Sequence, residues 1–192
     1  MAETQAGTLE HAATDPRAAR VAAFWREAGP DRWFTKDDAF DAAFRDAFLD
    51  LHFAAARREL DDWMQAPESA FALLVLLDQF PRNCFRGTGH MYATDPLARM
   101  FARRAVDAGF DRAFEPLLRV FFYLPFTHSE DLEDQERCVA LNRASCPMYE
   151  KHAVGHRDII RRFGRFPHRN PILGRETTPE EQAFLDAGGF AG

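Results

Sequence analysis

A seven-residue stretch near the middle of the chain, FALLVLL (71–77), is apolar on every side. It is far shorter than the roughly 20 residues that a helix needs to cross a bilayer. Pro67 precedes the stretch and Pro81 follows it, and proline is tolerated in the first turn of a helix but not in its interior. We therefore expect a helix from Pro67 to Pro81 that other helices cover on all sides.

Apolar residues at helical spacing surround this central segment. Phe40, Phe44, Phe48 and Leu51 recur every three or four residues and predict a long helix that ends near Met64. Capping residues, prolines and glycines predict further helices over 15–28, 95–109, 112–124, 129–144, 148–163 and 178–188. No stretch shows the alternation of a strand. The sequence thus predicts an all-α fold of about eight helices in antiparallel pairs around residues 71–80, without a sheet.

The length of 192 residues suits one domain, and no linker divides the chain. Residues 1–14 are small and polar, so we expect a disordered arm at 1–14 and a single domain over 15–192. The net charge of −6 argues against nucleic-acid binding. No signal peptide or membrane span is visible, and the three cysteines form no CxxC pair, which favours a reducing cytoplasm.

The first polar motif is LLDQFPRN (76–83), where the apolar helix ends in Asp78, Gln79, Arg82 and Asn83, with Arg86 just beyond. Polar groups at the end of a buried helix must find partners or stay in contact with water. Asp78 and Arg82 are four residues apart and could simply pair with each other. The alternative is that this helix end forms the floor of a polar pocket.

The second motif is YLPFTHSEDLEDQ (123–135), where Pro125 ends one helix and Ser129 can cap the next. His128 and Glu130 then lie at a helix N-terminus, where the helix dipole favours carboxylates. Adjacency of His128 and Ser129 does not make a hydrolase pair, because nucleophile and base meet through the fold. His128 and Glu130 are candidates for acid–base work, with Glu130 as a base or as the group that orients a histidine.

The third motif, HRDIIRRFGRFPHRNPILGR (156–175), is the richest in arginine and histidine. Forked guanidinium donors in such a loop could bind a phosphate or carboxylate, or could instead bond helix ends and neighbouring acidic groups. His168 is a third candidate for proton exchange near neutral pH. The candidate ligand-binding residues in this motif are His156, Arg165, Arg169, Asn170 and Arg175.

A metal site is not favoured. His152 and His156 are spaced as zinc ligands on one helical face, but Ala153 follows the first histidine where the metalloprotease motif has glutamate. No phosphate-cradling glycine loop occurs, because Gly87 and Gly89 lack the required spacing and lysine. The sequence indicates no particular cofactor.

The three motifs, together with DRWF (31–34) and LDDWM (60–64), resemble the domain-of-unknown-function 924 family of bacterial proteins. The resemblance covers about 22–185 and implies a tetratricopeptide-like helical fold, but no established activity. The positions that match the family pattern are Asp78, Gln79, Arg82, Asn83, Arg86, Asp95, His128, Ser129, Glu130, Gln135, His156, Asp158, Arg165, His168, Arg169, Asn170 and Arg175. Within this resemblance the region 144–154 looks variable, and no function is expected there.

We expect the loops at 78–86, 125–130 and 163–170 to converge on one pocket, with Arg82, Arg165 and Arg169 holding an anionic group. Three hypotheses remain open. The pocket could bind a small anionic molecule, with acid–base or hydrolytic chemistry as an extension. The protein could bind a peptide or protein partner in an exposed groove that presents Trp25, Trp33 or Trp63, by analogy with tetratricopeptide-like folds. The motifs could also be purely structural.

Overall fold

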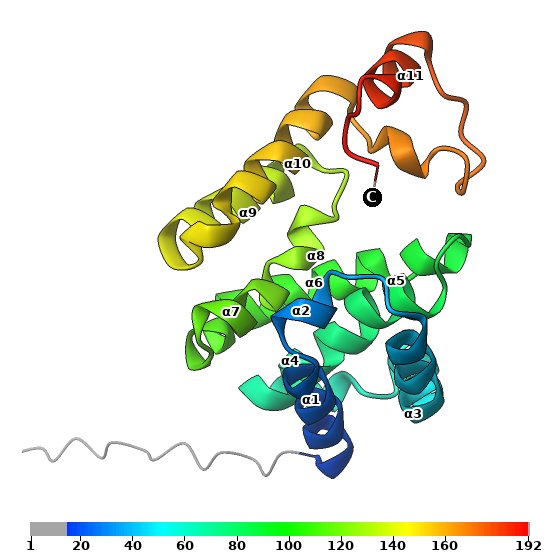
Figure 1. Ribbon diagram of the computed structural model, residues 1–192. Coiled ribbons are helices and arrows are strands. Elements are labelled where there is room, and N and C mark those ends of the chain that lie inside the picture. Colours follow the sequence, from blue (N-terminus) through cyan, green and yellow to red (C-terminus); the bar gives the residue numbers. More distant parts are fainter. Residues whose placement is uncertain (1–14, 192) are drawn as a thin grey trace, which may run out of the picture.

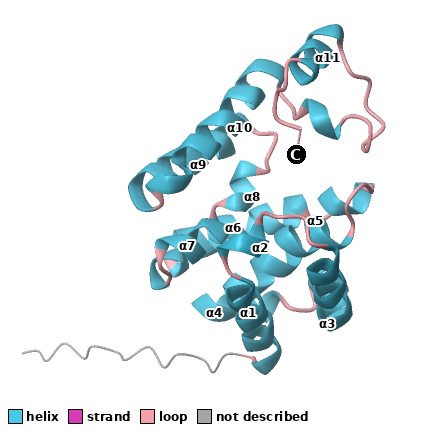
Figure 2. Cartoon of the chain, viewed as in Figure 1, coloured by secondary structure: helices cyan, strands magenta, loops and turns pink. Residues whose placement is uncertain are grey.

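The computed structural model describes residues 15–191, so the predicted arm at 1–14 and the last residue lie outside the described residues. Helices dominate the chain, and no strand occurs in the described range, which confirms the all-α prediction (Figure 2). The α-helices are α1 (Pro16–Ala28), α2 (Pro30–Trp33), α3 (Asp38–Ala56), α4 (Pro67–Leu74), α5 (Phe80–Cys84), α6 (Asp95–Asp107), α7 (Pro116–Arg119), α8 (Leu124–Thr127), α9 (Leu132–Ser145), α10 (Glu150–Phe163) and α11 (Pro179–Asp186). Short 3₁₀ segments join them: η1 (Asp61–Gln65), η3 (Gly89–Tyr92), η4 (Phe110–Ala113), η5 (Val120–Phe122), η6 (Pro147–Tyr149) and η7 (Pro167–Arg169).

The long helices begin at the side-chain caps that their sequences provide. Asp15 accepts a hydrogen bond from the Arg17 amide at the start of α1, and Asp37 accepts from the first turn of α3. Thr35 and Asp38 have the spacing of a capping box, which predicts Thr35 as the cap of α3, but Asp37 caps the helix instead. α11 has a full capping box, in which Thr178 and Glu181 each accept from the other's backbone amide.

α3 ends at Ala56, eight residues before the predicted end at Met64. Arg58 has a φ of 66°, a left-handed conformation that interrupts the helical hydrogen bonds. The helical spacing of apolar residues extends past this turn in the sequence, because Leu60 and Trp63 are also buried, at the start of η1 and within it. The periodicity therefore reported burial correctly but not the helix end.

The central segment is a helix that continues through Pro81 to Cys84 rather than ending there. A π-helical turn, η2 (Val75–Gln79), links α4 to α5, and the Phe80 amide bonds to the Val75 carbonyl five residues back. A single extra residue of this kind shifts the helix register, so Pro81 enters α5 in a first-turn position that needs no amide donor.

Side chains from other elements bind the carbonyls that this irregular turn leaves free. His52 Nδ1 donates to the Leu76 carbonyl at 2.9 Å, and Thr94 Oγ1 donates to the Leu77 carbonyl at 2.5 Å. Arg82 Nη1 donates to the Asp78 carbonyl at 2.7 Å. The irregular turn is thus held from α3, from the start of α6 and from α5, and it fixes the positions of the Asp78 and Gln79 side chains.

Most apolar side chains join one large cluster around the central helix. Residues 71–77 are at most 1% exposed, as the apolar pattern predicted. Stacked and edge-on aromatic rings from α1, α3 and η5 surround Trp25 and Phe44. A smaller cluster of Ile159, Ile160 and Phe166 holds the end of α10 against the segment that follows.

α9, α10 and α11 lie above this core in Figure 1, where α9 and α10 run side by side and α11 lies near the C-terminal end of α10. α8 connects the two parts, because it packs on both α6 and α9. No helix within residues 15–191 is both long and apolar enough to cross a membrane. The arrangement leaves a hollow between α5 and η3 on one side and α10 and η7 on the other.

Candidate functional site

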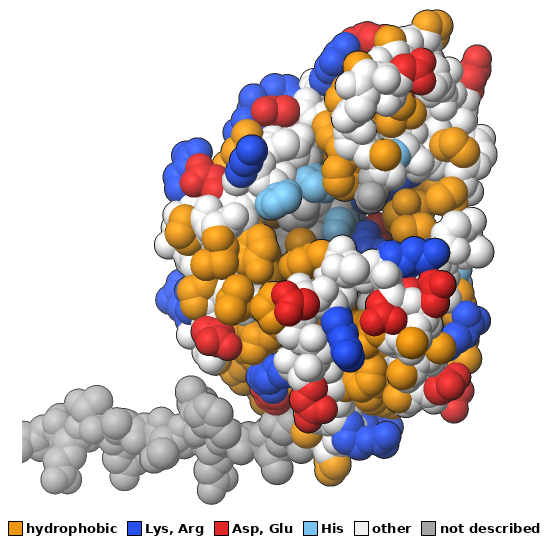
Figure 3. Space-filling view, in the orientation of Figure 1, with side chains coloured by type: hydrophobic (Ala, Val, Ile, Leu, Met, Phe, Trp, Pro, Cys, Tyr) orange, Lys and Arg blue, Asp and Glu red, His pale blue; other side chains and the backbone are white. Residues whose placement is uncertain are grey.

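A cleft of about 460 Å³ lies between the two parts of the molecule. Figure 3 shows histidines in this hollow, between an area of hydrophobic side chains and a group of basic ones. The elements that form it come from the whole length of the chain, from α2 to the C-terminal tail. Its lining comprises Trp33, Phe34, Gln79, Arg82, Asn83, Arg86, Met91, Tyr92, Val120, Leu124, Thr127, His128, Asn142, Tyr149, His152, Ala153, His156, His168, Arg169 and Phe190.

Residues of all three sequence motifs meet in this cleft. The helix end at 78–86 contributes Gln79, Arg82, Asn83 and Arg86, and the turn after α8 contributes His128. The third motif contributes His156, His168 and Arg169. Three arginines and four histidines therefore line the cleft, whereas no Asp or Glu among residues 15–191 does so.

Asp78 lies directly beneath the lining and is 1% exposed. His128 Nδ1 is 2.8 Å from Asp78 Oδ1, and Gln79 Nε2 donates to Asp78 Oδ2 at 2.6 Å. Burial raises the pKa of Asp78, but the charge of Arg82 and the contact with His128 outweigh it and hold that pKa at about 2. Asp78 is therefore ionised near neutral pH, and His128 donates its Nδ1 proton to it.

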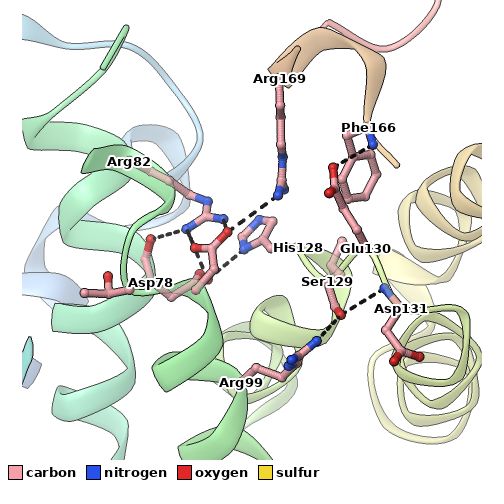
Figure 4. A network of polar contacts seen from close by, with 12 residues as sticks. Asp78, Arg82, Arg99, His128, Ser129, Glu130, Asp131, Phe166 and Arg169 are labelled. Carbon is pink, nitrogen blue, oxygen red and sulfur yellow. Dashed lines mark hydrogen bonds and ion pairs between the residues drawn. The ribbon is translucent and has the colours of Figure 1, made fainter. Parts of the chain in front are cut away.

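Arg82 is already neutralised from within the protein. Its guanidinium forms a bidentate pair with Asp95, at 2.8 and 2.9 Å, and its Nη1 is 3.3 Å from Asp78 Oδ1 (Figure 4). Such a forked pair fixes the guanidinium plane. Arg82 therefore fixes the geometry of the cleft floor, and most of its N–H donors are already used within the protein. Asp95 matched the family pattern but was not among the predicted ligand-binding residues.

Arg169 has a different environment. It is 6% exposed, and its guanidinium is packed between the rings of Tyr92 and Phe166, 4.6 and 4.5 Å from their centroids. Its guanidinium donates no hydrogen bond to any residue of 15–191; Nε has no partner, and Nη1 only approaches Asp95 Oδ2 at 3.6 Å. Burial and the nearby charge of Arg82 lower the pKa of Arg169. A buried cation without a hydrogen-bond acceptor is costly.

Three of the cleft histidines, His128, His156 and His168, have lowered pKa values. His156 Nδ1 donates to the His152 carbonyl at 2.8 Å, and Phe190 covers the rings of His156 and His168 at 4.5 and 5.1 Å. Burial lowers the pKa of both His156 and His168 to about 4. Burial and the charge of Arg82 also lower the pKa of His128. The imidazoles therefore add proton acceptors rather than positive charge near pH 7.

The apolar part of the cleft was not predicted from the sequence. Phe34 is 56% exposed, stacks on Phe121 at 6.0 Å and meets Tyr149 edge-on at 6.3 Å. Tyr149, His152 and Ala153 also line the cleft, although no function was expected for the region 144–154. A single aromatic residue in a loop carries no pattern, so only the fold reveals that Phe34 and Tyr149 lie on the same wall.

Glu130 does not line the cleft, although the sequence predicted it as a base or as the group that orients a histidine. Its carboxylate pairs with Arg175 at 2.7 and 3.0 Å and accepts from the Phe166 amide at 2.8 Å. Arg175 likewise does not line the cleft. Burial raises the pKa of Glu130, but the bonds to Arg175 and to the Phe166 amide outweigh burial, so the pKa lies below its usual range. The pair fastens the loop after α10 to the turn before α9.

Arg165 and Asn170, which the sequence predicted as ligand-binding residues, also do not line the cleft. Arg165 donates to both oxygens of Glu181, at 2.6 and 2.8 Å, and Asn170 Nδ2 donates to Glu181 at 3.2 Å. These bonds attach α11 to the loop before it. The Ser129 hydroxyl is also occupied, because it accepts from Arg99 at 2.9 Å (Figure 4) and donates to Asp134 at 2.9 Å.

The described residues contain no group of three or more His, Cys, Asp or Glu side chains placed to bind a metal ion. His152 and His156 share a helical face, but their contact runs from a ring nitrogen to a backbone carbonyl. Cys84, Cys138 and Cys146 are buried and unpaired by disulfides, and burial raises the pKa of each thiol.

The fold and this cleft define an all-helical protein with an arginine- and histidine-lined cavity between two packed parts. Residues 21–189 match the family described as "Bacterial protein of unknown function (DUF924)", and the chain belongs to that family. It is similar to a solved structure of a protein of unknown function from Agrobacterium tumefaciens, with 62% identity and a TM-score of 0.87 over 89% of this chain and 97% of that one. No curated protein matches the chain.

Proposed function

We propose that the cleft binds a small organic anion, with Arg169 as the main anion-binding group. The observation that carries this proposal is a guanidinium that is 6% exposed, makes no hydrogen bond within the described chain and lines a cleft with no carboxylate on its wall. A carboxylate or phosphate would supply the missing acceptor through forked bonds. Tyr92 and Phe166 keep the guanidinium plane in place and so reduce the ordering cost of binding.

The apolar wall indicates that the ligand also carries a hydrocarbon part. Phe34, Leu124 and Tyr149 line the same cleft as Arg169. Ligand cavities of this size typically combine apolar walls with a few polar groups that fix orientation. An aromatic or alkyl carboxylate would use both parts of the cleft, whereas inorganic phosphate would use only the cationic one.

The alternative of a peptide-binding module by analogy with tetratricopeptide-like folds is less well supported. Its expected groove would present tryptophans to solvent, but Trp25, Trp33 and Trp63 are at most 5% exposed. The purely structural hypothesis explains the pairs of Glu130 with Arg175 and of Glu181 with Arg165. It does not explain why Arg169 is buried without a hydrogen-bond acceptor.

Thermal unfolding in the presence of benzoate, hexanoate or inorganic phosphate tests the proposal. A ligand at 100 times its Kd stabilises the native state by about 2.7 kcal/mol, or roughly 5–10 °C in Tm for a chain of this size. We expect such a rise with benzoate or hexanoate, a smaller one with phosphate, and none in Arg169→Met.

Arg161→Ala is the matched control, because Arg161 lies on α10 with a 53% exposed side chain and pairs with Glu136 at the surface. It should keep the full response to ligand. An equal response to benzoate in the Arg169→Met and wild-type proteins would refute the proposal, as would the absence of any response in the wild type.

A further inference from the structure

We infer that the cleft is also the active site of a hydrolase, in which His128 is the general base that activates water against a carboxylic ester of a small anionic molecule. The inference rests on the proposed function, because Arg169 would bind the carboxylate of the substrate. It goes beyond that function by naming a reaction, a catalytic residue and Asp78 as the residue that positions it.

The tautomer of His128 follows from its contact with Asp78. The 2.8 Å bond places the proton on Nδ1, because Asp78 is a buried carboxylate that can only accept. Nε2 then carries a lone pair, and no hydrogen bond from residues 15–191 occupies it. His128 lines the cleft with a side chain that is 16% exposed, so this nitrogen is accessible to a small molecule there. Asp–His pairs of this kind hold a general base in the correct tautomer.

The nucleophile in this cleft is water. The Ser129 hydroxyl is committed to Asp134 and Arg99, and the three cysteines are buried outside the lining. Thr127 lines the cleft, but its hydroxyl is 2.9 Å from the Cys138 sulfur in the buried contact between α8 and α9. No side-chain nucleophile is therefore bonded to His128, whereas the cleft is open to solvent.

The proposed reaction is balanced without any further reactant. His128 Nε2 takes a proton from water while the water oxygen bonds to the ester carbonyl carbon, and the carbonyl electron pair moves onto oxygen. When the carbon–oxygen double bond re-forms, the bond to the alcohol oxygen breaks and the imidazolium returns its proton to that oxygen. The products are an acid and an alcohol, and His128 is neutral again. Asp78 stabilises the imidazolium that exists between the two transfers.

The charges around His128 fit a base that is neutral at rest. Figure 4 shows its ring beside the Arg82 guanidinium, with Arg169 reaching toward the same region from η7. Arg82 disfavours a proton on the ring, whereas the carboxylate of Asp78 favours one. The titratable and charged groups that face His128 are Asp78 on η2, Arg82 on α5, Asp95 on α6, His156 on α10 and Arg169 on η7.

The test uses mono-4-nitrophenyl glutarate, an ester with a free carboxylate, and follows release of 4-nitrophenolate. We expect turnover by the wild-type protein that saturates with substrate and exceeds that of uncharged 4-nitrophenyl butyrate. His128→Gln should lower kcat at least 100-fold, which is the usual contribution of a general base. Arg161→Ala should leave the rate unchanged. A wild-type rate at the buffer background, or an equal rate in His128→Gln, would overturn the inference.

Asp78→Asn gives a readout that a purely structural role would not change. Loss of the carboxylate should lower kcat and move the acid limb of the kcat–pH profile to lower pH, because the imidazole loses the negative charge that favours its protonated form. A profile with the wild-type midpoint would contradict the positioning role. Stabilisation of the wild-type protein by glutarate is measured separately, so binding of glutarate without hydrolysis of the ester by the wild type rejects only this inference and leaves the proposed function standing.

Discussion

Arg169 is placed where its charge is expensive to keep. Its guanidinium lies between two aromatic rings, and the nearest carboxylate, Asp95, already forms a bidentate pair with Arg82. Within residues 15–191 its charge has only the 3.6 Å contact with Asp95, which it shares with Arg82, and apolar replacements of weakly paired buried charges are often neutral or stabilising. A site kept for function at the expense of stability is the physical explanation that we favour for this position.

Replacement of Arg169 by methionine tests that explanation through stability alone. The side chain keeps much of its apolar volume between Tyr92 and Phe166 but loses the charge. We expect a Tm within about 3 °C of the wild type, or above it, because no hydrogen bond is lost. A fall of more than about 10 °C in differential scanning calorimetry would mean that the guanidinium is a structural element instead.

Glu130→Gln should behave in the opposite way. The substitution removes the charge that pairs with Arg175 and weakens the acceptor for the Phe166 amide. A cost of about 1–3 kcal/mol is typical for charge-assisted hydrogen bonds, which corresponds to a Tm lower by roughly 3–10 °C. Binding of benzoate, measured by calorimetric titration, should persist with its wild-type affinity. A stable variant that no longer binds benzoate would reverse our assignment of the two residues.

The residues of the third motif show what sequence reasoning could and could not separate. Arg165, Arg169 and Arg175 lie within eleven positions and share one chemistry, so each was an equal candidate. Their roles diverge because Glu181 and Glu130 reach two of them from α11 and from the turn before α9. Those partners are 16 and 45 residues away in the chain, and no local spacing indicates them.

At the level of the elements, the π turn η2 explains why the first motif predicted the buried helix but not its continuation past Pro81. Proline at position 81 indicates a helix end. The register shift in the π turn before it places Pro81 in the first turn of α5, where no amide donor is needed, so the helix continues. Irregular turns of this kind inside helices are frequent at functional sites. Here the turn places Asp78 beneath the cleft and Gln79 on its wall. The sequence left open whether Asp78 and Arg82 pair or form a pocket floor; Arg82 lies 3.3 Å from Asp78, and its bidentate pair is with Asp95.

Thr94→Val probes the support of this turn. The substitution leaves the buried Leu77 carbonyl without its 2.5 Å donor, and an unsatisfied buried acceptor costs about 1–3 kcal/mol. Thr88→Val is the matched control, because the Thr88 hydroxyl makes the same kind of bond to the Phe85 carbonyl at an exposed site where water can replace it. Denaturant unfolding should show a clear loss for Thr94→Val and little for Thr88→Val. Equal losses would mean that the turn does not need its side-chain donor.

Across the molecule, helix starts were predictable because they rest on local chemistry. Asp15 with Pro16, and Thr178 with Glu181, cap their helices as their spacing indicates, and Gly164 ends α10 in the left-handed conformation expected of it. The segment 112–124 was predicted as one helix but forms η4, α7 and η5 with breaks between them. Its apolar side chains pack in several directions. The breaks between these elements are therefore set by the surrounding core and not by the local sequence of the segment.

The whole fold should be sensitive to mild acid. The folded pKa of His156 and of His168 is about 4, against 6.5 for a free imidazole, so the unfolded chain binds more protons between these values. Stability is therefore fully present above pH 6.5 and is lost as the pH falls through this window toward 4. We expect the Tm to be flat from pH 7 to 8 and to fall by at least about 5 °C by pH 5.

His156→Gln is the control for that acid response, since it removes one of the titrating groups. Its Tm should depend less steeply on pH between 6.5 and 4. The carboxylates of Asp78 and Glu181 contribute little above pH 5, because their pKa values fall from 3.8 and 4.5 to about 2 on folding and their effect on stability begins only below about pH 4.5. A Tm that stays constant down to pH 5 would show that the imidazoles are not buried as described.

A crystal structure of the protein grown with benzoate tests the anion-binding cleft most directly. We predict electron density for a carboxylate within hydrogen-bond distance of the Arg169 guanidinium, with the aromatic ring directed toward Phe34 and Tyr149. An empty cleft at saturating benzoate, with Arg169 hydrogen-bonded to a group of the protein itself, would contradict the account.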